Sequence, residues 1–149
     1  MAQSRNVLKE FGKVSVVNDR LNVESLTAAS TLDSEDSGKV FVLNLAAGFT
    51  TTLPTPQAAS SGWHATFVVG TAPTGGNYVI TSGAANIHAV GSTNEDAGGD
   101  GPSSAGTADT NINFVANQAL VGDRVHLFTD GTAYYAEYAV DEVADITLT

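Results

Sequence analysis

Short β-rich segments separated by turn residues fill the chain from Val40 to Val140. β-branched and aromatic residues mark the segments, and glycine, proline, asparagine and aspartate separate them. No helical period of apolar residues lies between the segments, so βαβ units are not expected. The pattern predicts an all-β fold: an antiparallel β-sandwich or a small, jelly-roll-like β-barrel.

The clearest local signal is the segment from Arg124 to Val140. Asp130-Gly131 separates two alternating apolar runs there, and this pair suits the positive φ angles of a tight turn. We therefore expect a β-hairpin, followed by an edge strand over residues 146–149. The other expected strands are 40–45, 49–53, 63–69, 77–81, 87–90 and 112–116.

Length and cysteine content exclude several classes of protein. A chain of 149 residues is expected to form one domain with a substantial core. It has no cysteine, which excludes disulfides, thiolate zinc sites and thiol nucleophiles. Residues 1–6 are polar and lead into no apolar segment, so a signal peptide is not expected. The apolar runs are far shorter than a membrane-spanning helix requires, and we expect a soluble protein.

Charge is distributed unevenly. The chain has 16 acidic and 6 basic residues, and five of the basic ones lie in the first 39 positions. From residue 40 onward, Arg124 faces ten carboxylates, a net charge of −9. So acidic a body repels phosphate groups, and we expect no nucleic-acid partner.

Residues 1–39 show weaker apolar alternation than the body at residues 40–149 and end in a polar, acidic stretch. We interpret them as an extended N-terminal arm with one or two short strands. Twenty extended residues reach about 65 Å, far enough to touch a neighbouring molecule. The alternative is a first strand of the same domain together with a frayed terminus.

The segment from Asn94 to Asp109 is rich in glycine and carboxylates and has little to bury. We expect an exposed loop that presents Glu95, Asp96, Asp100 and Asp109 to solvent. These carboxylates are chemically suited to Ca²⁺, but their spacing matches no calcium-binding motif, so no metal is expected.

No catalytic constellation stands out, and neither catalytic residues nor a cofactor are expected. His64, His88 and His126 lie singly in expected strands, without a partner at ligand spacing, and are expected to be half-buried or exposed. Tyr134 and Tyr138 share one strand face and are expected in the core, as is Trp63. Tyr135 lies on the opposite face, where it is a candidate for an exposed or intersubunit contact.

Three strings and a hairpin carry a resemblance to a known family. Residues 40–54, 62–69 and 77–82, followed by the Asp130-Gly131 hairpin, resemble β-rich modules of tailed-phage structural proteins. They look most like the small head decoration, or cement, proteins. Tail-fibre and head-fibre modules contain similar strings.

The resemblance implies a virion protein on the outer surface of the phage capsid, assembled in the host cytoplasm. Such proteins are commonly homotrimers that dock on the major capsid protein and clamp neighbouring capsomers. They have no active-site residues to transfer and no membrane partner. We expect the arm to make the contact, with Arg5, Lys9, Lys13 and Arg20 facing acidic capsid patches and Val7, Leu8 and Phe11 buried against the shell.

Two other classes remain as alternatives. A fibre module that binds host glycans predicts an exposed Trp63 or Tyr135. A hydrolase predicts a pocket that gathers one of the three histidines with a carboxylate. The chain has no long shaft or attachment repeat, which favours decoration over a fibre.

Overall fold

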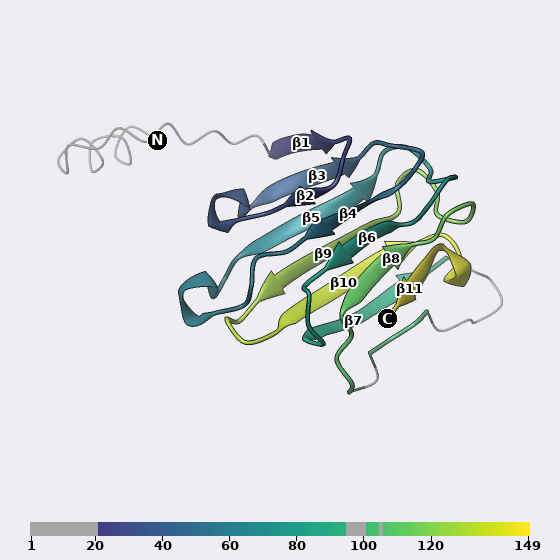
Figure 1. Cartoon of the computed structure of the whole chain (residues 1–149). Helices are drawn as coiled ribbons and strands as arrows, with labels where there is room; N and C mark the ends of the chain where they lie inside the picture. The colour runs from purple at the N-terminus through teal and green to yellow at the C-terminus, as the bar shows by residue number, and fades with distance from the viewer. Residues whose placement is uncertain (1–20, 95–100, 105) are drawn as a thin grey trace, which may run out of the picture.

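The computed structural model describes residues 21–94, 101–104 and 106–149, which form a two-layer β-sandwich (Figure 1). Sheet A contains, in spatial order, β1 (Asn22–Leu26), β3 (Lys39–Leu43), β5 (His64–Val69), β9 (Arg124–Thr129), β10 (Tyr134–Val140) and β7 (Ile87–Thr93). Sheet B contains β11 (Ile146–Leu148), β8 (Asn111–Phe114), β6 (Tyr78–Thr81), β4 (Phe49–Thr52) and β2 (Ser30–Thr31). Three short 3-10 helices, η1 (Ser34–Asp36), η2 (Ala58–Ser60) and η3 (Val143–Asp145), lie between strands. The expected all-β sandwich is confirmed.

The pairing of the strands corrects one part of that expectation. Both sheets are mixed: β1, β3 and β5 pair in parallel, as do β2, β4 and β6, and β7 pairs in parallel with β10. Antiparallel pairs join β9 to β5 and β10, and β8 to β6 and β11. The predicted β9–β10 hairpin and the predicted edge strand β11 are therefore both present.

The parallel pairs arise because the chain alternates between the two sheets. From β1 to β6 each strand lies in the sheet opposite its predecessor, so every second strand lands beside the strand two before it. A parallel pair needs a crossover of a dozen or more residues. Here a strand of the other sheet supplies that crossover, where sequence reasoning had considered only helices.

Alternation along each strand fills the space between the sheets. Phe41 and Phe67 are register partners in β3 and β5, and their rings stack at 5.2 Å. Trp63 is buried against Tyr134, with ring centroids 6.0 Å apart. The hydroxyl of buried Tyr78 donates to the Thr71 carbonyl and accepts from the Leu45 amide. Each large ring thus has either an apolar neighbour or a partner for its polar atom.

Residues 21–39 form part of the sandwich. β1 and β2, the one or two short strands expected in this region, are edge strands of sheets A and B. Leu26 and Leu32 are buried in the core, and the Lys39 ammonium lies 2.8 Å from the Glu24 carboxylate and 2.6 Å from that of Asp36. The strands at residues 22–31 therefore pack into the same sandwich as the strands of the body.

The outer faces of the two sheets differ in chemistry. The outward positions of sheet B are mostly threonine and asparagine, as in the row Thr50, Val79, Asn113 and Thr147. Sheet A instead exposes large apolar side chains, namely Val23, Val90, Phe128 and Tyr135. In the part of the chain described, no helix has the length and apolar character needed to cross a membrane.

Gly91 of β7 gives a test of the packing between β7 and β10. A Cβ at this position would lie 2.4 Å from ring carbons of Tyr138, which is buried and therefore has little room to move. We expect Gly91→Ala to lower the free energy of unfolding by about 1–3 kcal/mol, as overpacking commonly does. Urea unfolding measures this, with the exposed neighbour Ser92→Ala as the control. Equal stability of the two variants would contradict the contact.

Candidate functional site: an aromatic pocket on sheet A

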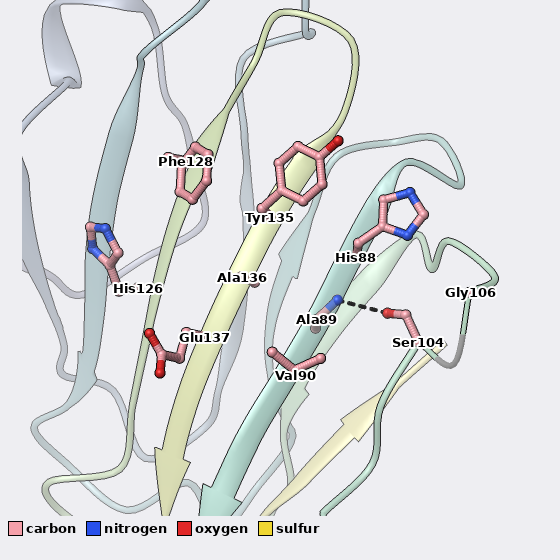
Figure 2. A pocket seen from close by; sticks show the side chains of 10 residues that line it. All are labelled: His88, Ala89, Val90, Ser104, Gly106, His126, Phe128, Tyr135, Ala136 and Glu137. Carbon is pink, nitrogen blue, oxygen red and sulfur yellow. Dashed lines mark hydrogen bonds between the residues drawn. The ribbon is translucent and has the colours of Figure 1, made fainter.

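The candidate site is a cavity of about 480 Å³ on the outer face of sheet A, where β9, β10 and β7 lie side by side (Figure 2). The side chains that give it its chemistry are Phe128, Tyr135, His88, His126, Glu137 and Ser104. We call this the aromatic pocket. Its volume lies within the range of about 300–1,000 Å³ typical of small-molecule sites.

The alternation of β9 and β10 points these side chains outward. Val125 and Leu127 of β9 are buried, which leaves His126 and Phe128 on the outer face. In β10 the same period of two places Tyr135 and Glu137 outside. A slip of one residue would exchange the two sets, so the register of the hairpin decides which residues line the pocket.

The hairpin turn holds that register. Oδ1 of Asp130 accepts hydrogen bonds from the amides of Thr132 at 2.7 Å and Ala133 at 2.9 Å. Gly131 has φ 94°, and a Cβ there would lie 2.8 Å from the Gln57 carbonyl oxygen. The Ala133 amide, followed by that of Thr132, holds the pKa of the Asp130 carboxyl below its ordinary value. Asp130 thus stays ionised and fixes the turn.

Three aromatic side chains form a row across the strands. Phe128 and His88 are the register partners of Tyr135 on its two sides. The ring centroids of Phe128 and Tyr135 are 5.5 Å apart, and those of Tyr135 and His88 are 5.8 Å apart, with interplanar angles of 28° and 24°. The Tyr135 hydroxyl donates to Oδ2 of Asp130 at 3.3 Å. The turn carboxylate therefore also anchors the central ring.

A segment beside the edge of β7 forms one wall of the pocket. Oγ of Ser104 accepts from the Ala89 amide at 2.7 Å and donates to the Asp109 carboxylate at 2.8 Å. The Ser104 amide donates to the Ala89 carbonyl at 3.0 Å. The hydroxyl of buried Tyr138 donates to the Pro102 carbonyl at 2.5 Å. These bonds tie the wall to β7 and β10.

The three histidines are half-buried or exposed, as expected. His88 and His126 line the aromatic pocket, and Glu137 is the register partner of His126. Nδ1 of His126 lies 3.0 Å from Oγ1 of Thr66, and Nδ1 of His64 lies 3.1 Å from the Gly62 carbonyl oxygen. Among the described residues no histidine is hydrogen-bonded to a carboxylate. The pocket thus gathers two histidines and a carboxylate, the grouping that the hydrolase alternative predicts, and the described residues show no hydrogen bond between them.

The structure also places the other residues singled out in the sequence. Trp63, Tyr134 and Tyr138 are buried as predicted, and Tyr135 is 39% exposed on the opposite face. Asp109, expected in an exposed loop, is half-buried and bonded to Ser104. Within the described ranges no three potential ligands gather to hold a metal ion. The expected contact residues Arg5, Val7, Leu8, Lys9, Phe11, Lys13 and Arg20 and the loop residues Glu95, Asp96 and Asp100 lie outside the described residues.

Sequence reasoning missed Phe128, Glu137 and the grouping of His88 with Tyr135. The alternation in the predicted hairpin already places Phe128 on the same face as Tyr135. The third ring was not predictable in this way, because it reaches the row only through the parallel pairing of β7 with β10.

We expect the pKa of Asp130 to lie below the ordinary aspartate value and the pKa of Asp123 to lie above it. The lowered pKa of Asp130 means that its carboxylate stabilises the fold above the unfolded-state pKa, and this contribution is lost as pH falls through the folded value. Burial raises the pKa of Asp123, so its contribution is present at low pH and is lost as pH rises through the folded value. Carboxyl ¹³C shifts followed against pH measure both midpoints. A midpoint for Asp130 at or above that of Asp123 would contradict the assignment.

Comparison with known proteins adds no relative. No family model, no curated protein and no solved structure matches the chain. The function proposed below therefore rests on the sequence, on the edge strands β1 and β7 of sheet A and on the aromatic pocket.

Proposed function

We propose that this protein is a capsid decoration protein, which binds the outer surface of a phage head as a trimer and stabilises the contacts between capsomers. The proposal begins from the resemblance of residues 40–140 to such proteins. The structural observation that supports it further is the exposed, apolar edge of the sandwich that directly follows residues 1–20.

That junction is an exposed and apolar edge. The described chain starts at Leu21, whose side chain is 75% exposed, and β1 follows with Val23 at 57%. β1 is the edge strand of sheet A, so in the described structure one side of its backbone has no partner strand. Unpaired edges are templates on which another chain can add a strand. A docking partner would find both apolar surface and free backbone groups there.

Charge favours the same end of the molecule. Residues 1–20 contain four basic and two acidic residues, a net charge of +2 in a protein whose total is −10. The only other basic residues are Lys39, which pairs with two carboxylates, and Arg124. An acidic capsid surface would thus attract the N-terminal segment and repel the body. Because decoration binds the assembled lattice and not its separate parts, it shifts the equilibrium towards the lattice.

Antibody-gold labelling of purified virions, viewed by negative-stain electron microscopy, tests the location. We expect dense labelling over the head. Labelling confined to the tail or to sparse fibres would favour the receptor-binding alternative, and unlabelled particles would contradict a virion role altogether.

Deletion of residues 1–20 tests the docking end. Because β1 begins at Asn22, we expect the shortened chain to keep the far-ultraviolet circular dichroism and melting behaviour of the full chain. We also expect it to lose binding to heads in a co-sedimentation assay, since the basic and apolar side chains of the segment are gone.

A matched variant separates charge from apolar contact. Replacing Arg5, Lys9, Lys13 and Arg20 with glutamine keeps the length and the apolar residues, and its binding should weaken and lose its dependence on salt. Thr50→Ala, on the outer face of sheet B, is the surface control. Unchanged binding after the deletion would refute docking through the N-terminal segment while leaving the labelling result to stand.

A further inference from the structure

The aromatic pocket has features that attachment to a capsid does not explain. It lies over β9, β10 and β7, and β7 is the edge of sheet A opposite β1. Docking through β1 would therefore leave the pocket free. Three rings also line up there on a surface where Phe128 is 46% exposed and Tyr135 is 39% exposed. Aromatic rings exposed together on a sheet are a common mark of a binding surface.

The rings offer a flat apolar strip. Figure 2 shows the outer face of sheet A, and in this view the rings of Tyr135 and His88 are seen face-on. With ring centroids spaced by 5.5 and 5.8 Å, the strip is long enough for more than one six-membered ring. The rings form a row and do not surround a point, which is unlike the aromatic cages that bind quaternary ammonium groups.

The polar groups around the strip select against anions. Glu137 contributes a carboxylate beside the rings, and no lysine or arginine is among the described residues that line the pocket. The body around the pocket is strongly acidic. A phosphate, sulfate or carboxylate ligand would meet repulsion without a compensating cation. A neutral ligand rich in hydroxyl groups would instead donate hydrogen bonds to Glu137 and to the imidazole nitrogens of His88 and His126.

The pocket is built before any ligand arrives. The Ser104 wall is fixed to β7 by two hydrogen bonds to Ala89, and Tyr135 is tied to the hairpin turn through Asp130. Neighbouring rings in the row also lie within 5.5 and 5.8 Å of each other, centroid to centroid, and this contact limits their rotation. Ordering side chains on binding costs affinity, and a surface that is already ordered avoids most of that cost.

We propose that the aromatic pocket binds a neutral saccharide. The apolar C–H face of a pyranose ring packs on Phe128 and Tyr135, His88 extends the strip to a second ring, and Glu137 accepts hydrogen bonds from the sugar hydroxyls. This inference does not depend on the capsid role, because the chemistry of the pocket stands without the N-terminal segment.

Binding is tested on the full chain with a defined set of neutral oligosaccharides: maltohexaose, cellohexaose, xylohexaose, mannohexaose and the hexamer of N-acetylglucosamine. We expect isothermal titration calorimetry to give a Kd of about 1 mM or tighter for at least one of them. Saturation-transfer NMR should place the protons of that sugar against aromatic protons of the protein. No binding by any of the five at 10 mM would overturn the proposal.

Variants then assign the binding to the pocket. Phe128→Ala and Tyr135→Ala should each weaken binding at least tenfold, whereas Tyr135→Phe, which keeps the ring, should remain within about threefold. Thr50→Ala on the opposite sheet is the control, and melting curves confirm that each variant is folded. Unchanged affinity in both alanine variants would overturn the assignment, as would tighter binding of choline than of every sugar. The chain lacking residues 1–20 should keep its sugar affinity, which separates this result from the capsid experiment.

Discussion

From β1 to β6 the chain alternates between the two sheets, and within each sheet successive strands pair in parallel and in register. This in-register pairing is the constraint on which the rest of the structure depends. Each strand from β1 to β6 presents one face to the core, and the next strand along the chain lies in the opposite sheet. Parallel partners within a sheet then align so that Phe41 lies beside Phe67. A slip of one residue would turn an entire row of core side chains towards solvent. The hydrophobic cost of such a slip is large, because these side chains are almost completely buried.

The β9–β10 hairpin builds the aromatic pocket into that frame. It lies between β5 and β7, so one strand of the hairpin continues the antiparallel pairing and the other brings β7 alongside in parallel. Tyr138 shows how closely this region is coupled. Its ring fills the space that Gly91 leaves on β7, and its hydroxyl holds Pro102 in the segment that walls the pocket. Tyr138 therefore contributes both to the core beneath the aromatic pocket and to the segment that forms its wall.

The two proposals use opposite edges of one sheet. β1 carries the exposed apolar side chains and the basic N-terminal segment, whereas β7 borders the aromatic pocket. A protein with an attachment edge and a recognition edge can stay bound to a surface while presenting a binding site to the surroundings. The outer face of sheet B, with its rows of threonine and asparagine, offers neither large exposed apolar side chains nor a ring to stack on.

The sequence by itself determined the all-β class, most strand positions, the hairpin at Asp130-Gly131 and the opposite faces of Tyr134 and Tyr135, because all of these follow from alternation and turn chemistry between neighbours along the chain. Only the tertiary structure decided which strands pair and in which direction. Parallel partners lie a whole crossover apart, and no local pattern specifies whether a helix or a strand of the other sheet provides it. The grouping of His88 with Tyr135 and Phe128 was beyond sequence reasoning for the same reason, since it exists only where β7 meets β10.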